Sequence, residues 1–443
     1  MDELFRDFNI IIKEALRSIS PAELFKEKIF IDTNQIICQN NSFQLDQFAN
    51  IYVIGFGKAS SAMASEIEKY LSEKITDGIV ITKYGFKTPT QKIKVFEAGH
   101  PLPDENTLIF SNEIMNLLTR TGSNDLVICL ISGGGSSLFE VPLDGIDLQT
   151  LRLFNEFLIK QKIPIHKINF FRKAISKVKG GKLLKFIYPS TCISFIISDV
   201  IGNDISVISS GPTCLDEMES FIEDDDVPKV KKYFSKEDAL HQLERLIKFK
   251  KFSNELIEYH NNKVFNFIIS SNRTAVDKAI EEAVKLGYEI HSFKYDVSKS
   301  VEKMKEDFIN EFLNLKRSNE KIKKAIVYGG ETFLEVKGTG KGGRNSHLIL
   351  LILNELLKSK VEINFKFLIS SFATDGNDGN TDAAGAYINN QIIEEVKNSK
   401  YSPESYLQDF DSYNFFDAFN CLIKTGPTFN NVADFFICLT SFE

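Results

Sequence analysis

The sequence has no tryptophan, and its six cysteines are scattered singly, without a C-x-x-C pair. Such spacing gives neither a disulfide framework nor a zinc motif, and it is typical of free thiols in a reducing compartment. No apolar run approaches the roughly 18 residues that a membrane span needs. The first 20 residues lack the basic start of a signal peptide and read as an amphipathic helix. We therefore expect a cytoplasmic protein with no part in the membrane.

A long basic block is also missing. The chain carries 60 acidic residues against 53 lysines and arginines, a net charge of −7. This balance argues against nucleic acid or an anionic membrane as the main partner. The 443 residues, with 43% hydrophobic and 26% charged residues, suit a soluble chain of two domains.

Several catalytic motifs are absent as well. There is no G-x-S-x-G elbow, no H-E-x-x-H, no Walker G-K-[ST], and the histidines have no metal-ligand spacing. Acyl transfer, zinc hydrolysis and a P-loop are therefore poorly supported. His100 stands before a proline in a turn, which favours a structural or ligand-orienting role over that of a general base.

Apolar runs and helical patterns alternate along the chain, which predicts an α/β fold with a parallel sheet covered on both faces. In the first half we expect strands at 51–57, 78–83, 93–99, 125–132 and 192–199, with helices near 58–72, 104–120, 148–161 and 166–187. A second series of strands begins near 263. An acidic and then lysine-rich stretch separates the two series, so we expect domains at 1–230 and 263–443, joined by a helical linker at 231–262.

Glycines cluster where the expected strands end. Gly55, Gly57 and Lys58 follow one apolar run, and this arrangement brings backbone N–H groups and a cation to an anion. A tight turn with a surface lysine is the simpler alternative. This segment matches part of the dinucleotide-binding fingerprint. In that fingerprint an acidic residue at the end of the next strand binds a ribose hydroxyl, but here that strand ends in Lys83.

A second glycine loop follows the strand expected at 125–132. Its hydroxyl and glycine residues form a flexible cradle of donors for phosphate oxygens or a carboxylate: Ser132, Gly133, Gly134, Gly135 and Ser136. Glycine triplets also occur in ordinary loops.

Two carboxylates are candidates for a metal site or for accepting a substrate proton. Asp199 ends the strand expected at 192–199, where such sheets bind ligands. Asp375 lies in a glycine-rich loop with Asp378 and Asp382, whose register does not fit an EF-hand. For Asp199 the alternative is an Asx turn or a helix N-cap, and the carboxylates of the glycine-rich loop are equally typical of turns.

In the second half, six glycines and three cations lie within residues 329–344. Arg344 is expected at or near a helix start, where the helix dipole disfavours a cation. A cation in that position is explained by an anionic ligand. Glycine loops, cations and strand-end carboxylates without a strong nucleophile are typical of phosphoryl transfer.

The chain resembles the glycerate 2-kinase family, whose C-terminal half is called the MOFRL domain. The resemblance covers about residues 50–435 and rests on ten ordered motifs: GFGKAS, AGHPLPDENT, LISGGGSSL, NFFRKAISKVKGGKL, SDVIGND, SSGPT, GGET, GKGGRNS, TDGNDGNTDAAGA and TGPTFNNV. It implies a Rossmann-like N-terminal domain and a C-terminal domain with the MOFRL segment at about 322–438, with the active site in the cleft between them.

The resemblance further implies Mg²⁺-assisted, ATP-dependent phosphorylation of D-glycerate, usually at the 2-hydroxyl. The lysine and arginine that the family singles out fall on Lys58 and Arg344, which we expect to be catalytic. We expect substrate or phosphate contacts from the two glycine loops and from Lys179, Gly180, Glu331 and Asn345, and metal contacts from Asp199 and Asp375. A homodimer is compatible with the sequence, which does not fix the number of subunits.

Three positions depart from the family pattern: Asn203, His347 and Phe429. Each of them can change the choice of substrate, whereas none bears on the kinase class. Two other functions stay open, an NAD(P)H-dependent hydroxypyruvate reductase and a non-catalytic protein that binds sugar acids or nucleotides. The reductase needs a dinucleotide site, against which Lys83 argues.

Overall fold

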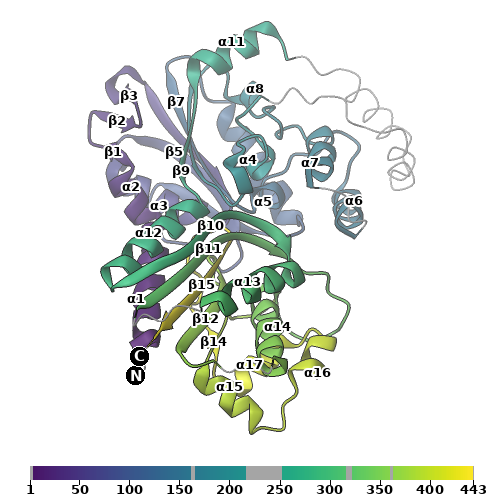
Figure 1. Cartoon of the computed structure of the whole chain (residues 1–443). Coiled ribbons are helices and arrows are strands. Elements are labelled where there is room, and N and C mark those ends of the chain that lie inside the picture. Colours follow the sequence, from purple (N-terminus) through teal and green to yellow (C-terminus); the bar gives the residue numbers. More distant parts are fainter. Residues whose placement is uncertain (1–2, 161–164, 216–251, 316–321, 360–362, 443) are drawn as a thin grey trace. The chain divides into compact units, whose positions relative to one another are not determined.

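The computed structural model describes residues 3–160, 165–215, 252–315, 322–359 and 363–442 (Figure 1). The chain folds into two compact units. We call Leu24–Ile269 the N-terminal unit, and Met1–Glu23 together with Ser270–Glu443 the C-terminal unit. Each unit is described by itself.

A six-stranded sheet forms the centre of the N-terminal unit. Its strands lie in the order β6 (Ile93–Ala98), β5 (Ile75–Lys83), β4 (Asn50–Phe56), β7 (Asp125–Ser132), β8 (Thr191–Ile197) and β9 (Val264–Ser270). The pairs from β6 to β8 are all parallel. All eight residues of β7 are buried, as expected for a parallel strand covered on both faces. The five strands expected in the first half are confirmed.

Helices connect these strands, and a small antiparallel sheet precedes them. The helices are α2 (Pro21–Glu27), α3 (Ser60–Leu71), α4 (Glu105–Leu118), α5 (Gly135–Leu138), α6 (Leu148–Lys160), α7 (Ile165–Ala174), α8 (Leu184–Ile187) and α11 (Asn254–Lys263). The 3₁₀ turns are η1 (Leu45–Gln47), η2 (Ile201–Asn203) and η3 (Ile208–Ser210). The small sheet contains β1 (Ile29–Ile31), β2 (Gln35–Cys38) and β3 (Asn41–Gln44).

The expectation of one helix over 166–187 is wrong. α7 ends at Ala174 and α8 begins only at Leu184. Between them, Gly180 and Gly181 adopt φ values of +62° and +80°, which a right-handed helix cannot contain. Their N–H groups donate to the carbonyls of Ser210 and Gly211, at 2.9 and 2.7 Å. The segment is a turn that binds to η3.

The C-terminal unit has a mixed six-stranded sheet. The order is β10 (Tyr288–Ser300), β11 (Lys323–Phe333), β15 (Asp434–Ser441), β12 (Lys366–Ala373), β13 (Gly385–Asn389) and β14 (Leu422–Ile423). Only the β10–β11 pair is parallel. β9, which opens the second series of strands in the sequence, belongs to the sheet of the N-terminal unit, and β13 was not expected.

Helices cover this sheet on both faces (Figure 1). α13 (Val301–Leu315) and α14 (Arg344–Lys358) share one apolar core with Ile326, Tyr328, Phe436 and Cys438 of the central strands. α12 (Asn272–Lys285) contacts β10, β11 and β15. The remaining helices are α15 (Asn390–Lys397), α16 (Pro403–Gln408) and α17 (Ser412–Ala418).

The first helix belongs to the C-terminal unit, whereas the expected N-terminal domain, residues 1–230, included it. α1 (Glu3–Ser18) packs against α12 and buries Leu4, Phe8 and Ile11. The buried Asp7 accepts a hydrogen bond from the hydroxyl of Tyr288 at 3.0 Å and pairs with Lys323 at 3.2 Å. The linker itself lies mostly outside the described residues. The C-terminal unit is therefore built from both ends of the chain.

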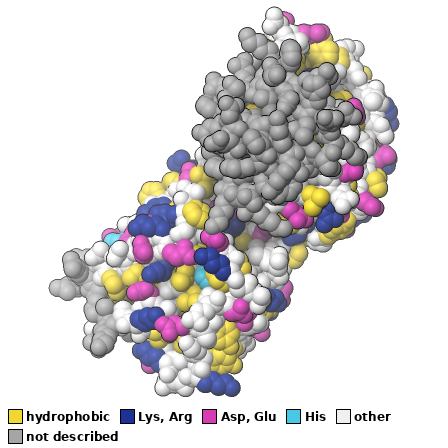
Figure 2. All heavy atoms as spheres, turned by 90° about the vertical axis from the view of Figure 1, so that its right-hand side faces the viewer, with side chains coloured by type: hydrophobic (Ala, Val, Ile, Leu, Met, Phe, Trp, Pro, Cys, Tyr) yellow, Lys and Arg dark blue, Asp and Glu magenta, His cyan; other side chains and the backbone are white. Residues whose placement is uncertain are grey.

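The surface fits the mildly acidic composition. Figure 2 shows one face of the molecule, on which basic and acidic side chains are interspersed among the described residues. Within the described part of the chain, no helix is long and apolar enough to span a bilayer.

Candidate active site

The glycine loops of the N-terminal unit meet at one edge of its sheet. Because β4, β7 and β8 are parallel, the segments that follow them all start from this edge. The backbone N–H of Lys58 donates to the carbonyl of Gly133 at 2.9 Å, and the N–H of Ala59 donates to Ser132 Oγ at 2.9 Å. The two loops that the sequence indicated separately are thus hydrogen-bonded to each other.

Two glycines make this close approach possible. Gly57 has a φ of +124°, and a Cβ at this position would collide with Ser132 Oγ. Gly134 has a φ of +84°, and a Cβ there would lie 3.0 Å from His100 Nε2 and 3.3 Å from Lys58 Cγ. The side chains of Lys58 and His100 therefore both lie close to the Gly134 backbone. Lys58 follows the end of β4 at the start of the turn into α3.

Serines brace the loop from the side of η3. Ser136 Oγ lies 2.8 Å from Ser210 Oγ, and Ser209 Oγ donates to the carbonyl of Ser132 at 2.9 Å. Ser209 and Ser210 have φ values of +51° and +62°, a conformation uncommon for residues other than glycine. Such backbone strain concentrates at functional sites. Neither serine was selected from the sequence, because a hydroxyl residue in a loop carries no sign of its φ.

Not every residue of these loops is open to a ligand. Ser132 is buried, and its hydroxyl accepts from the backbone of Ala59. Gly55 lies inside β4 and packs against Leu130, while Gly135 begins α5 beside Ser209. These three residues shape the loop. The side chains that pack closest to Gly134 are those of Lys58 and His100.

Lys179 does not take the phosphate-binding position that we expected. Its side chain is 1% exposed, and its Nζ contacts Glu140 and donates to the carbonyl of Phe139 at 3.2 Å. Burial lowers the pKa of Lys179, against the opposing effect of Glu140. Burial likewise lowers the pKa of Lys182 to about 8, and Lys182 Nζ donates to the carbonyls of Lys173 and Ser176 at 2.5 and 2.7 Å. This segment supports the loops from inside the protein.

In the C-terminal unit, Arg344 is the first residue of α14, as expected. β15 runs antiparallel to both neighbours, so its first residue, Asp434, pairs with Gly330 of β11 and Ala373 of β12. Arg344 donates to both carboxylate oxygens of Asp434, from Nε at 2.5 Å and from Nη2 at 3.0 Å. Its Nη1 pairs with Glu331 at 2.5 Å. The guanidinium is therefore held by two carboxylates.

A third carboxylate lies at the start of α14. Asp378 is buried and accepts from the backbone N–H of Asn345 at 2.9 Å and from that of Ser346 at 2.8 Å. Burial raises the pKa of Asp378, while these hydrogen bonds act in the opposite direction. Burial alone would lower the pKa of Arg344, but Asp434 and Glu331 raise it. Carboxylates of the protein itself thus offset the unfavourable position of the Arg344 cation at a helix N-terminus, which the sequence alone had attributed to an anionic ligand.

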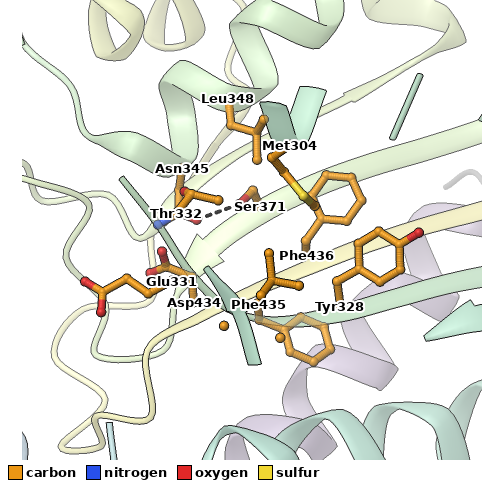
Figure 3. Close-up of a pocket in the computed structure, with 13 residues that line it drawn as sticks. Met304, Tyr328, Glu331, Thr332, Asn345, Leu348, Ser371, Asp434, Phe435 and Phe436 are labelled. Carbon is orange, nitrogen blue, oxygen red and sulfur yellow. Dashed lines mark hydrogen bonds between the residues drawn. The ribbon is translucent and has the colours of Figure 1, made fainter. Parts of the chain in front are cut away.

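A small cavity of about 20 Å³ lies beside these groups, enough for about one water molecule. Figure 3 shows Met304, Leu348 and Phe436 on one side of it and Glu331 and Asp434 on the other. Asn345, which we expected to touch the substrate, is buried in the wall and accepts from Ser371 Oγ at 2.5 Å.

The expected metal ligands do not form a protein-only metal cage. Asp375 is buried and accepts from the N–H of Asn377 at 3.0 Å, whereas Asp382 is exposed and bonds the hydroxyl of Tyr413 at 2.5 Å. Asp199 belongs to the other unit, just after β8. Among the described residues, no three His, Cys, Asp or Glu side chains are grouped so that they could hold an ion.

The three positions that depart from the family pattern each have an unusual local structure. Asn203 and Phe429 adopt φ values of +57° and +58°. Asparagine tolerates this region, whereas phenylalanine is strained there. His347 is 5% exposed, and its ring stacks on Phe410 with centroids 5.0 Å apart. Its Nδ1 is buried with no hydrogen-bond partner among the described residues.

We expect His347 to make the protein sensitive to acid. Burial lowers its pKa from 6.5 to about 4, opposed in part by Glu302. The folded state therefore binds this proton less readily than the unfolded chain. Stability should fall as the pH falls from about 6.5 towards 4, by up to about 3 kcal/mol for this group, and this contribution should be constant below that window.

Urea unfolding of the full chain near pH 7.5 and near pH 5 measures this effect. The His347→Phe protein should have a shallower pH dependence, because the phenyl ring keeps the stacking and has no proton to bind. The exposed His291 provides a matched control, and His291→Phe should keep the wild-type slope. Equal slopes in wild type and His347→Phe would exclude this role for His347.

The sequence matches two known families. Residues 7–242 match the family described as a domain of unknown function (DUF4147), and residues 324–434 match the MOFRL family. Lys58 falls in the first match, and Arg344 and Asp434 in the second. A glycerate 2-kinase from Pyrococcus horikoshii is 34% identical over 97% of this chain and 96% of its own.

The chain belongs to the glycerate 2-kinase family. A further member, the D-glycerate 2-kinase of Thermotoga maritima, is 31% identical over 97% of this chain and 96% of its own. A crystal structure of the glycerate kinase from Thermotoga maritima matches with a TM-score of 0.79 and 30% identity, covering 98% of each chain. The family membership and the α/β architecture expected from the motifs are confirmed.

Proposed function

We propose that this protein is a glycerate 2-kinase, which transfers the γ-phosphoryl group of ATP to the 2-hydroxyl of D-glycerate. The products are ADP and 2-phospho-D-glycerate, and the hydroxyl proton is released. The observation that carries this proposal is near-full-length similarity to enzymes with that name. The chemistry of the site supports it as well, because phosphoryl transfer depends mainly on positioning and on neutralising charge. The cations for this are Lys58 after a strand end and Arg344 at a helix start, and the donors come from the Gly134 loop.

We assign Lys58 and Arg344 to the same reaction. Lys58, next to Gly134, supplies a cation to the transferring phosphoryl group, and the loop around Gly133 and Ser136 supplies donors. Arg344 offers the planar fork of N–H groups that matches a carboxylate or phosphate. Asp199 is the candidate to accept the substrate proton. We keep Lys179, Gly55 and Ser132 as residues that position these groups.

Magnesium fits the available donors in one particular mode. Mg²⁺ prefers oxygen ligands and is commonly held by one or two carboxylates together with nucleotide phosphates and water. Asp199 and Asp375 each supply a carboxylate close after a strand end, so either can serve in this mode without a complete protein cage. When bound, Mg²⁺ would neutralise charge on the phosphates. A homodimer and a cytoplasmic location remain predictions from the sequence.

An assay of the purified full chain tests the proposal. ATP, MgCl₂ and D-glycerate should yield ADP in a coupled assay, and phosphorus NMR should place the new phosphate on C2. The Lys58→Ala protein should remain folded and lose most of this activity. Near-normal ADP release by folded Lys58→Ala would remove Lys58 from the mechanism.

Two outcomes would overturn the kinase assignment in favour of the alternatives from the sequence. NADH oxidation with hydroxypyruvate, without ADP release from glycerate, would identify a reductase. Stabilisation by glycerate or ATP without turnover would identify a binding protein, because a ligand of the folded state raises its stability by mass action alone.

A further inference from the structure

The two carboxylates on Arg344 are not equivalent. Asp434 is held rigidly at the start of the central strand β15, with its side chain 8% exposed. Its backbone carbonyl accepts from Asn272 Nδ2 at 2.9 Å, which further fixes it. Glu331, near the end of β11, has a side chain that is 46% exposed.

The contacts divide the guanidinium between these carboxylates. Asp434 takes the Nε and Nη2 edge in a bidentate pair, the strongest geometry for such an interaction. Glu331 takes a single nitrogen, Nη1. Bidentate pairing fixes the plane of the guanidinium, so Asp434 determines the direction in which Nη1 points.

The charge count indicates what happens when an anion arrives. Glu331, Asp434 and the buried Asp378 already place three carboxylates around one guanidinium. Adding a further anion would increase the repulsion among like charges. Exchanging Glu331 for that anion keeps the charge unchanged, and Glu331 is the most exposed of the three.

We propose that Asp434 is the positioning residue of Arg344, and that Glu331 occupies on Arg344 Nη1 the place that an anionic group of the substrate takes. Glu331 is then an internal competitor of the substrate and not one of its ligands. The identity of the substrate rests on the proposed function. The competition with Glu331 for Arg344 Nη1 applies to any small oxyanion.

The Glu331→Gln protein tests the exchange, because the amide has the same size and no charge. The KM for D-glycerate should fall about five-fold, with a small change in kcat. Sulfate, as a probe that needs no turnover, should bind about five-fold more tightly by calorimetry. A raised or unchanged KM together with unchanged sulfate binding would show that Glu331 is not a competitor.

The Asp434→Asn protein tests positioning. Its kcat should fall about 10-fold or more, and it should bind sulfate more weakly. The melting temperature shows whether the variant stays folded; if it falls, kcat should remain low after correction for the folded fraction. Asp434→Glu should restore part of kcat. Full activity in Asp434→Asn would overturn the positioning role.

A control and a separate readout keep the two proposals distinguishable. Glu355 pairs with Lys305 at 3.0 Å and lies eleven residues beyond Arg344 on α14, roughly 16 Å along the helix. Glu355→Gln should leave KM and sulfate binding unchanged. If the wild type proves not to phosphorylate glycerate, the proposed function fails, while the sulfate affinities of the Glu331 and Asp434 variants still decide the exchange.

Discussion

Replacing Arg344 by lysine should lower kcat by about 10³-fold while the protein stays folded. An arginine that stabilises the transferring phosphoryl group contributes about 10³- to 10⁵-fold in kcat. Lysine keeps the charge but cannot form the planar bidentate contact with Asp434, which uses Nε and Nη2 of Arg344. The ammonium would therefore not be fixed in direction and could not present a planar fork of donors to a second anion.

Initial rates of ADP release at saturating ATP and D-glycerate measure this effect, with circular dichroism and thermal unfolding as tests of folding. Arg273 is the matched control, since it is an exposed arginine of the same unit, paired with Asp277 at 3.6 Å. Arg273→Lys should keep wild-type kcat. A folded Arg344→Lys protein with kcat within about three-fold of wild type would remove Arg344 from the transition state.

The sequence predicted the parts of the site that depend on strand ends. In a parallel sheet, a residue at the carboxyl end of an apolar run must lie at the ligand-binding edge, whatever the rest of the fold does. This rule located Lys58 and the loop around Gly134, and the apolar run of β7 was readable because both its faces are buried. The helix start at Arg344 was predictable from the glycines before it and the apolar periodicity after it.

Asp434 could not be predicted in the same way. It lies 90 residues after Arg344, as the first residue of an apolar strand, and only the antiparallel placement of β15 between β11 and β12 brings it to the guanidinium. The sequence carries no sign of that strand order, because each strand of the mixed sheet has the same apolar pattern whether its neighbours are parallel or antiparallel. The packing of α1 could not be assigned to either half from the sequence for a related reason: an amphipathic helix does not specify which sheet it covers.

Lys179 was misassigned because a lysine beside two glycines has the same sequence pattern whether its ammonium group is exposed or buried. Its partner, Glu140, is 39 residues away, and nothing in the sequence around Glu140 indicates that this side chain is buried. The pair therefore belongs to the stability of the N-terminal unit.

The Glu140→Gln substitution should destabilise the N-terminal unit by about 3–5 kcal/mol, the usual cost of leaving one member of a buried ion pair alone. Glu140 and Lys179 are only 4% and 1% exposed, so water cannot replace the lost carboxylate. For a unit of this size we expect a fall in melting temperature of roughly 10 °C. Hydrogen exchange of β7 and β8 in the full chain would show that the loss lies in this unit.

The deficit should also depend on pH. The pKa of Lys179 is already lowered by burial, and removal of Glu140, which raises it, lowers it further. The folded Glu140→Gln protein then releases the Lys179 proton at a lower pH than either the folded wild type or the unfolded chain. The stability of the Glu140→Gln protein should therefore rise with pH relative to wild type, and the deficit should shrink as the pH rises towards the ordinary lysine range.

A nearby surface pair and a double variant complete the test. Lys177 and Asp144 form a pair at 2.6 Å in which Asp144 is 88% exposed, so Asp144→Asn should cost less than about 1 kcal/mol. Glu140→Gln combined with Lys179→Met removes both buried charges and should recover most of the lost stability. If the double variant is as unstable as Glu140→Gln alone, the loss comes from altered packing and not from an unpaired charge.

The single variant should also lower kcat, and the double variant should restore it. The reason is that the N–H of Gly180 donates to the Ser210 carbonyl, and Ser210 Oγ is hydrogen-bonded to Ser136 Oγ of the glycine loop.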